Sequence, residues 1–315
     1  MFPAYIQPPL EFKLVDSQGI PCRAKFWPSK KHCETYLLFI PGTQLPDKKR
    51  LRIGNPGVIS YYDEFLTSLH DDSPNTTILG VSLAGHEEYE VNPPLSLQQE
   101  IHSKLRIVDT IFQSSPFTSL AGDKPRFIVM GHSVGAYISF EILKQRPQQV
   151  DNLFLLFPTL SALSEGSTFG RFASVVTQVP YASVIAALIT FIFRLIFPIP
   201  LLALWLRLGH SLTGTSLSVT LAKLFNPASV RSFSYLARHE FRDIRELDVD
   251  SLTKYAKRIT AYYAVQDGWV PNTERERIMG IINGNGGDAF ICNEGFPHAF
   301  SLSTTPLVCC AIVDL

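Results

Sequence analysis

The sequence predicts an α/β fold in which helices cover a mostly parallel sheet. Short apolar runs alternate with segments of helical spacing through the first half of the chain, and the alternation returns near its end. The chain has 315 residues, of which 46% are hydrophobic, and this is enough to bury a large core. Because α/β folds of this length commonly form one domain, we expect a single domain over residues 1–315.

The expected strands and helices alternate from residue 36 to residue 157, and the alternation resumes at residue 259. Apolar runs predict buried strands at residues 36–40, 76–82, 126–130, 153–157, 259–265 and 289–292. Helical spacing predicts helices at residues 59–69, 97–112, 135–144, 273–279 and 299–313, the last one kinked at Pro306. This order is typical of a sheet built from strand–helix–strand units.

A long apolar stretch interrupts the alternation between residues 172 and 224. Residues 175–193 and 196–208 are nearly all apolar, with one arginine and two prolines near the break between them. An insertion between two strands would lie at the mouth of such a fold. We therefore expect an apolar cap or lid over residues 161–245.

This stretch does not fit a helix that spans a membrane. A spanning helix needs about 20 apolar residues with few charges, whereas residues 180–197 number 18 and include Arg194. Spanning would also place the two halves of one sheet on opposite sides of the membrane. A hairpin over residues 175–208 that dips into a lipid monolayer is the preferred interpretation. A hydrophobic lid buried on the core is the alternative.

Charge and cysteine content exclude several classes of function. Lys+Arg and Asp+Glu both number 28, so nothing directs the protein toward nucleic acid. The five cysteines lack CxxC spacing, which predicts reduced intracellular thiols without a disulfide framework or a zinc site. The first ten residues show no basic region followed by an apolar run, so no secretory signal is expected. A mean hydropathy of +0.12 predicts an apolar surface.

The motif Gly131-His132-Ser133-Val134-Gly135 lies between a predicted strand and a predicted helix. This is the G-x-S-x-G pattern in the context that a nucleophile elbow requires. Side chains at either glycine would collide with the adjoining strand and helix, and the strained turn points the serine hydroxyl outward. The backbone N–H of Val134 can then bind a developing oxyanion. A chance match in a turn is the alternative, but the context favours an α/β-hydrolase fold with Ser133 as nucleophile.

The acid and the base should follow the serine in the order acid, then histidine. His298 lies in a loop after the last predicted strand, where a neutral imidazole can take the serine proton. Asp267 ends the 259–265 strand and can orient that imidazole. A surface-loop histidine and a turn aspartate are the alternative interpretations, and Asp288 is the second candidate acid. Other acids and histidines after the serine are less well placed: His210, His239, Asp243, Asp248 and Asp250.

A second oxyanion donor is expected after the first predicted strand, near Ile40-Pro41-Gly42. A tight turn that contains glycine brings a backbone N–H close to the substrate carbonyl. Gly42 and Thr43 are the candidates there.

Over most of its length, the chain resembles the lipid droplet-associated hydrolases. The residues that carry the resemblance are Phe39-Ile40-Pro41-Gly42, Asn55-Pro56-Gly57, Tyr61-Tyr62, Gly85-His86, Gly131 through Tyr137, Tyr262-Tyr263, Asp267 through Pro271, and Pro297 through Phe300. The resemblance implies that Ser133, Asp267 and His298 form a triad. It also implies an ester hydrolase that acts on neutral lipid, with sterol ester as one candidate, on lipid droplets and the endoplasmic reticulum.

The chain departs from the family pattern at the oxyanion turn. The family runs Ile-Pro-Gly-Asn-Pro-Gly without a break, and its asparagine forms part of that turn. Here residues 43–54, an atypical basic insertion, separate Gly42 from Asn55. A genuine surface loop and an error in the gene model both account for the insertion. Asn55 keeps an oxyanion role if the insertion loops out and returns the chain to the same place.

We therefore expect a serine hydrolase that cleaves sterol esters or acylglycerols through an acyl-enzyme on Ser133. It would act on the cytosolic face of lipid droplets, with endoplasmic reticulum association as a further expectation. No metal or organic cofactor is expected, because a triad and backbone donors suffice for ester cleavage. The rival hypothesis is a droplet-surface scaffold that keeps the fold with little or no turnover.

Overall fold

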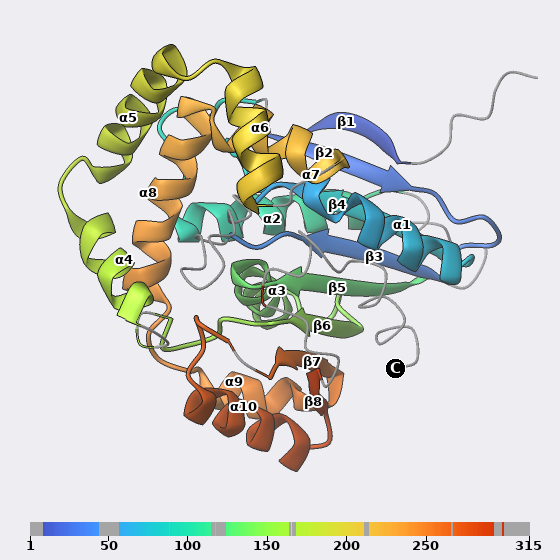
Figure 1. Cartoon of the computed structure of the whole chain (residues 1–315). Helices are drawn as coiled ribbons and strands as arrows, with labels where there is room; N and C mark the ends of the chain where they lie inside the picture. The colour runs from blue at the N-terminus through green and yellow to red at the C-terminus, as the bar shows by residue number, and fades with distance from the viewer. Residues whose placement is uncertain are drawn as a thin grey trace, which may run out of the picture.

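A computed structural model describes residues 9–43, 57–87, 89–114, 117, 124–163, 165, 168–210, 214–265, 267–292 and 298. Its centre is one eight-stranded sheet with the order β1-β2-β4-β3-β5-β6-β7-β8. The strands are β1 (Leu10–Val15), β2 (Pro21–Trp27), β3 (Thr35–Ile40), β4 (Thr76–Val81), β5 (Arg126–His132), β6 (Asn152–Leu156), β7 (Ile259–Ala264) and β8 (Asp288–Cys292). β2 pairs antiparallel with both β1 and β4, and every other pairing is parallel. In Figure 1 the strands succeed one another from β1 at the top to β8 at the bottom.

Helices cover both faces of the sheet. On one face, α2 (Leu97–Phe112), α3 (Val134–Gln145), α9 (Val249–Tyr255) and α10 (Asn272–Gly284) share a core with the sheet. A 3-10 turn at Ile59–Tyr62 and α1 (Asp63–Asp72) cover the other face. Successive side chains of β3 enter opposite cores, since Leu38 packs in the first and Phe39 in the second. This double burial explains why the parallel strands are continuous apolar runs.

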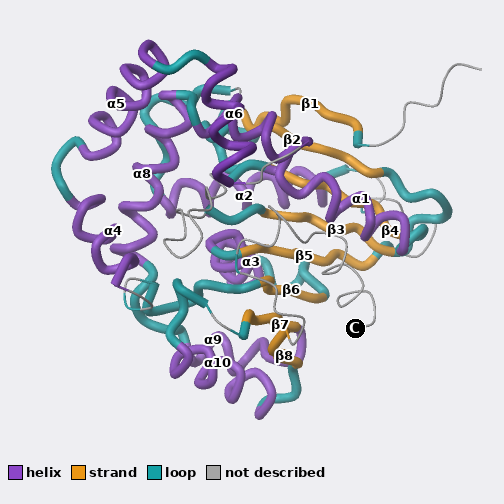
Figure 2. The backbone as a smooth tube through the Cα atoms, in the orientation of Figure 1, coloured by secondary structure: helices purple, strands orange, loops and turns teal. Residues whose placement is uncertain are grey.

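Six α-helices of the described chain lie between β6 and β7. The last is α9, and before it come α4 (Thr168–Gln178), α5 (Ala182–Ile196), α6 (Ile199–His210), α7 (Gly214–Val219) and α8 (Pro227–Asp243). A π-helix at Thr220–Leu224 separates α7 from α8. We call α4–α8 the insertion. Figure 2 shows these helices gathered at one end of the strands, and α5 packs along α8. The interruption between two apolar helices, which the prolines predicted, falls between α5 and α6.

The predicted α/β-hydrolase class is confirmed, and each strand expected from residue 36 onward is present within a residue or two. Two strands were not predicted, β1 and β2, which form an antiparallel hairpin at one edge. The predicted helix at 299–313 and residues 44–55, which hold most of the basic insertion and Asn55, lie outside the described residues.

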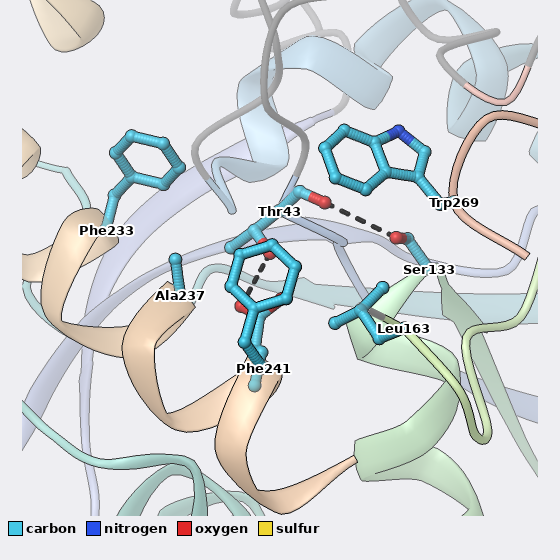
Figure 3. Close-up of a pocket in the computed structure, with 8 residues that line it drawn as sticks. Thr43, Ser133, Leu163, Phe233, Ala237, Phe241 and Trp269 are labelled. Carbon is cyan, nitrogen blue, oxygen red and sulfur yellow. Dashed lines mark hydrogen bonds between the residues drawn. The ribbon is translucent and has the colours of Figure 1, made fainter. Parts of the chain in front are cut away.

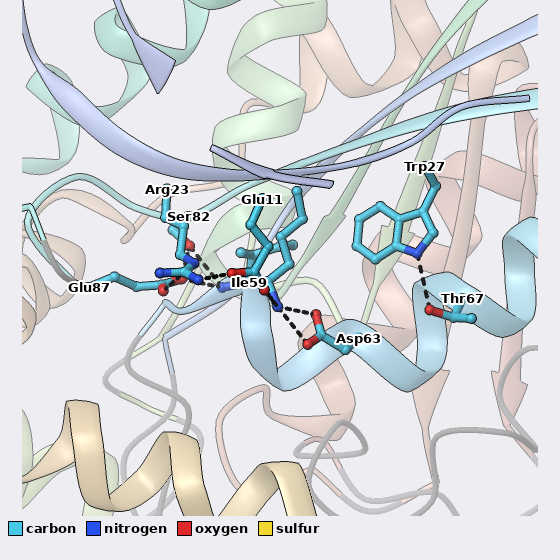
Figure 4. A network of polar contacts seen from close by, with 9 residues as sticks. Glu11, Arg23, Trp27, Ile59, Asp63, Thr67, Ser82 and Glu87 are labelled. Atoms are coloured by element: carbon cyan, nitrogen blue, oxygen red, sulfur yellow. Dashed lines mark hydrogen bonds and ion pairs between the residues drawn. The ribbon is translucent and has the colours of Figure 1, made fainter. Parts of the chain in front are cut away.

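The unpredicted hairpin is joined to α1 by an ion pair and a hydrogen bond, and Figure 4 shows Asp63, Trp27 and Thr67 among the residues involved. The Lys25 side chain is 2% exposed, and its Nζ donates to Asp63 Oδ1 at 2.8 Å and Oδ2 at 2.6 Å. Trp27 Nε1 donates to Thr67 Oγ1 at 3.1 Å. Buried strands are ordinarily apolar. A charged residue that points inward therefore makes β2 resemble a surface segment in the sequence.

Candidate active site

The nucleophile turn has the geometry that the sequence predicted. β5 ends at His132 and α3 begins at Val134, so Ser133 is the only residue between them, with φ 55° and ψ −120°. This left-handed conformation is strained for a residue with a side chain. A Cβ on Gly131 would lie 2.2 Å from the Gly135 carbonyl oxygen, and one on Gly135 would lie 2.2 Å from that of Ile40. Both glycines are therefore needed for the turn to pack between β3 and α3.

The structure brings the three predicted triad residues together. His298 Nε2 lies 2.9 Å from Ser133 Oγ, and His298 Nδ1 lies 2.6 Å from Asp267 Oδ2. Asp267 Oδ1 also accepts the Trp269 backbone N–H at 2.8 Å, which fixes the carboxylate plane. Ser133 and His298 are 4% and 7% exposed. With Nδ1–H donated to Asp267, Nε2 is the acceptor that a serine hydroxyl requires.

The second candidate acid is far from this cluster. Asp288 pairs with Thr260 at the beginning of the parallel β7–β8 ladder. Ser133 and Asp267 follow the carboxyl ends of β5 and β7. Asp288 therefore lies at the opposite, amino-terminal end of the strands, and the geometry favours Asp267.

A buried histidine that the sequence analysis did not single out joins two loops of the site. His132 Nδ1 lies 2.6 Å from Tyr62 Oη, and His132 Nε2 lies 2.9 Å from the His298 carbonyl oxygen. Because a carbonyl only accepts, Nε2 carries the proton and Nδ1 accepts from the tyrosine. Burial lowers the pKa of His132 well below its ordinary value, so the ring is neutral, as this pattern requires. Its position inside G-x-S-x-G and the Tyr61-Tyr62 pair were the only available signals.

The turn after β3 packs directly against the nucleophile. A Cβ on Gly42 would lie 2.3 Å from the His132 carbonyl oxygen and 2.5 Å from Ser133 Cβ. The Gly42 N–H donates to Tyr62 Oη at 3.3 Å. Thr43 is buried, and its carbonyl oxygen lies 3.3 Å from Ser133 Oγ. Because the Gly42 N–H is engaged, the N–H groups of Thr43 and Val134 remain as the oxyanion candidates.

A small cavity of about 20 Å³ lies above Ser133 (Figure 3). It has room for about one water molecule. One face of helix α8 forms one side of the cavity. The eight residues that line it are Thr43, Ser133, Leu163, Phe233, Ala237, Glu240, Phe241 and Trp269. A lipid ester is far larger, so such a substrate needs more room beside the serine than this cavity provides.

Glu240 is the residue of this cavity that the sequence analysis missed. Thr43 Oγ1 donates to Glu240 Oε1 at 2.6 Å, and the carboxyl group is buried. Burial raises its pKa from 4.5 to about 7, although the threonine hydrogen bond acts in the opposite direction. Glu240 is 197 residues from Thr43, so no local pattern connects the two.

The insertion exposes a broad apolar surface. No residue of α5 is buried, although one side of this helix packs on α8. Exposed fractions reach 56% at Leu188, 51% at Phe191 and 71% at Leu195. Leu202 and Leu206 of α6 instead pack with Leu217 in a separate small core. We call the exposed apolar side chains of α5 and α6 the apolar face.

Among the described helices, none is alone both long and apolar enough to cross a membrane. The part of α4 from Gly170 and helix α5 would meet that requirement together, but a bend of 99° separates them. Across the same described ranges, no group of three His, Cys, Asp or Glu side chains is arranged to hold a metal ion. Cys22, Cys33 and Cys292 are free thiols.

Comparisons with known proteins agree with this architecture. Solved structures with the same fold include a serine hydrolase from Cycloclasticus zankles, 14% identical with a TM-score of 0.64, covering 96% of each chain. A lipase-like protein from Acinetobacter baumannii is 14% identical with a TM-score of 0.62, covering 98% of this chain and 90% of that one. At these identities, the likeness concerns the fold alone.

Sequence relatives are more specific. Proteins named lipid droplet-associated hydrolase from Gallus gallus and Dictyostelium discoideum are 24% and 27% identical to this chain. The alignments cover 83% and 79% of this chain, and 82% and 80% of those relatives. A family model described as lipid-droplet associated hydrolase matches residues 51–301. The chain therefore belongs to the lipid-droplet associated hydrolase family, whose fold is that of the α/β-hydrolases.

Proposed function

We propose that this protein is a serine hydrolase that cleaves carboxylic esters of neutral lipids, such as sterol esters or acylglycerols, at the lipid droplet surface. The observation that carries the proposal is the hydrogen-bonded series Ser133, His298 and Asp267 beside a small cavity lined largely by apolar side chains. The relatives are named for their association with lipid droplets, and the apolar face of this chain is a surface suited to contact with lipid.

The geometry supports the two-step route of acyl transfer. Ser133 Oγ attacks the ester carbonyl carbon while His298 Nε2 takes its proton, and Asp267 stabilises the imidazolium. The N–H groups of Val134 and Thr43 would bind the oxyanion. The tetrahedral intermediate collapses, and the departing alcohol leaves with the proton from His298. Water then attacks the acyl-enzyme with the same base and releases the fatty acid.

The test is covalent labelling of Ser133 by a fluorophosphonate, detected as a mass increase on the intact protein. We expect one adduct per wild-type chain and none on Ser133→Ala, because labelling requires an activated serine. A lipid extract incubated with each protein identifies which ester class disappears. Equal labelling of wild type and Ser133→Ala would refute the assignment of the nucleophile.

Droplet association through residues 175–208 is part of this proposal. The apolar face would enter the acyl region of a monolayer on the cytosolic side, with the endoplasmic reticulum membrane as the alternative surface. Arg194 lies near the end of α5 and Arg207 within α6, where long side chains can place their charges at the headgroups.

A droplet-surface scaffold with little turnover is the second candidate. The small cavity above Ser133 favours it, because at about 20 Å³ it has no room for a lipid ester. The two candidates differ in one measurement. A scaffold leaves the extracted esters unchanged even when droplets are present, whereas the hydrolase consumes them once the cap opens.

A further inference from the structure

We propose that Glu240 is a positioning residue that, by accepting a hydrogen bond from Thr43, holds the turn after β3 in the place where it supports the oxyanion. The proposal rests on the hydrolase function proposed above. It assigns to helix α8 a part in arranging the reaction centre as well as in covering it.

Thr43 is held in the site by contacts on two sides. On the sheet side, Gly42 packs against the His132 carbonyl, and the Thr43 carbonyl oxygen lies 3.3 Å from Ser133 Oγ. On the opposite side, the Thr43 hydroxyl donates to Glu240 Oε1 at 2.6 Å. Figure 3 shows Thr43 between Ser133 and the α8 side chains Ala237 and Phe241. Glu240 therefore determines where the outer side of Thr43 rests.

Helix α8 is a firm support for this contact. Its first turn is capped by the Asn226 side chain, which accepts the Ala228 N–H at 2.9 Å. Gln178 of α4 donates to the Arg238 carbonyl oxygen at 3.0 Å. Leu236, Ala237 and Phe241 are buried in the main core. A carboxyl group on such a helix has little freedom to follow a moving partner.

The surroundings of Glu240 make the threonine bond its main compensation. Burying a carboxyl group without hydrogen-bond partners costs free energy. A residue that only filled space at this position would therefore be apolar. The other residues that line the cavity carry no acidic or basic side chain. On the same helix, His239, Arg242 and Asp243 bind one another, with Arg242 donating to His239 Nδ1 at 2.8 Å and to Asp243 Oδ1 at 2.7 Å.

The proposed role follows from how an oxyanion hole works. Its donors stabilise the transition state only when they are held in place beforehand, and removing one donor costs about 10²–10³ in kcat. Moving the donor without removing it costs less. Loss of the Glu240 contact should therefore slow acylation by about tenfold or more while leaving the base and the acid intact.

The rate of Ser133 labelling by a fluorophosphonate is a suitable readout, because the phosphonyl oxygen occupies the oxyanion position whatever the natural substrate is. Glu240→Leu and Thr43→Val should each slow labelling by about tenfold or more, and the double variant should be no slower than either single one. Glu240→Gln and Thr43→Ser keep an acceptor and a donor, so both should label within about threefold of wild type. Asp243→Leu is the matched control on the same helix.

Two further measurements separate positioning from general damage. With p-nitrophenyl butyrate, Glu240→Leu should lower kcat and leave KM unchanged, because the contact acts on the transition state. The pH dependence of labelling should lose one ionisation in Glu240→Gln. Thr43→Val provides the same test from the turn side if Glu240→Leu fails to fold.

Each outcome has a distinct meaning. Absence of labelling in the wild type would refute the proposed hydrolase function itself. Normal labelling of Glu240→Leu, or additive losses in the double variant, would overturn only the positioning role. Faster labelling of Glu240→Leu would also overturn it, because Glu240 would then hold the cavity shut.

Discussion

At the residue scale, one series of hydrogen bonds links the turn after β3 to His298. Gly42 N–H donates to Tyr62 Oη, the tyrosine donates to His132, and His132 donates to the His298 carbonyl. The turn after β3 and residue His298 are thus connected through Tyr62 and His132. A neutral imidazole suits this place, because it donates and accepts at once without a buried charge.

The assignment of the acid is tested by exchanging each carboxylate for its amide. Asp267→Asn should lower kcat by roughly 10⁴-fold, because the amide favours the wrong tautomer of His298. Asp288→Asn should have near wild-type activity, since Asp288 lies at the amino-terminal end of the strands, away from Ser133. Hydrolysis of p-nitrophenyl butyrate measures both. Wild-type rates for Asp267→Asn with an inactive Asp288→Asn would exchange the two roles.

The raised pKa of Glu240 predicts a pH-dependent stability. Its pKa is about 7 in the folded protein and 4.5 ordinarily, so the folded state binds the proton more tightly. The associated stabilisation is complete below about pH 4.5 and is lost as pH rises through 7. Relative to Glu240→Gln, the wild type should lose about 3 kcal/mol between pH 4.5 and 8. Urea unfolding of both proteins at several pH values measures this difference, and a constant difference would contradict it.

Residues with a local context could be found in the sequence, and residues defined by packing could not. Ser133 was located because its flanking glycines, strand and helix are contiguous, and Asp267 and His298 because the order rule limits the choices. Their catalytic roles remain predictions. Glu240 and Tyr62 reach the site only through the packing of α8 and of the 3-10 turn at Ile59–Tyr62 against the sheet. A glutamate on an amphipathic helix resembles any solvent-exposed one until its partner is known.

At the element scale, the main difference between expectation and structure is the β1–β2 hairpin. Most residues of β1 are exposed, and β2 places Lys25 beneath the sheet edge where an apolar side chain is the norm. Periodicity is informative only where burial and polarity agree. The central strands obey that condition, because helices cover both of their faces, and they were predicted closely.

Removing the Lys25 ammonium should show that this hairpin is anchored by a buried ion pair. Lys25→Ala leaves the partly buried Asp63, whose side chain is 25% exposed, without its partner and should cost about 2–3 kcal/mol of unfolding free energy. Lys30→Ala is the matched control, because Lys30 and its partner Asp71 are 46% and 60% exposed. It should change stability by about 0.5 kcal/mol or less. Equal effects in urea unfolding would mean that the buried pair contributes nothing special.

At the scale of the whole molecule, charge and hydropathy are segregated. Residues 161–245 carry eight Lys or Arg and three Asp or Glu, whereas the complete chain has 28 of each. The insertion is therefore formally +5 and the remainder −5. A basic insertion that also exposes the apolar face is suited to a phospholipid surface, where each cation near anionic headgroups contributes about 1 kcal/mol. The overall neutrality of the sequence concealed this division.

The apolar face makes the last prediction, which separates lipid docking from core packing. Charges at Leu188, Phe191 and Leu195 (all to Glu) should release the protein from droplets into the cytosol without unfolding it, because these side chains are more than half exposed. Each would have to enter lipid at a cost of up to about 2.5–3.5 kcal/mol, which is less near the interface.

Leu202 is the contrasting position for the same experiment. Its sequence context is as apolar as that of Leu188, but it is 5% exposed and packs in the core that α6 shares with α7. Leu202→Glu should therefore destabilise the insertion by several kcal/mol. Flotation with artificial droplets and thermal unfolding measure the two effects independently. If the triple variant still floats with droplets and unfolds in solution, α5 is a buried lid, and the docking surface lies elsewhere on the molecule.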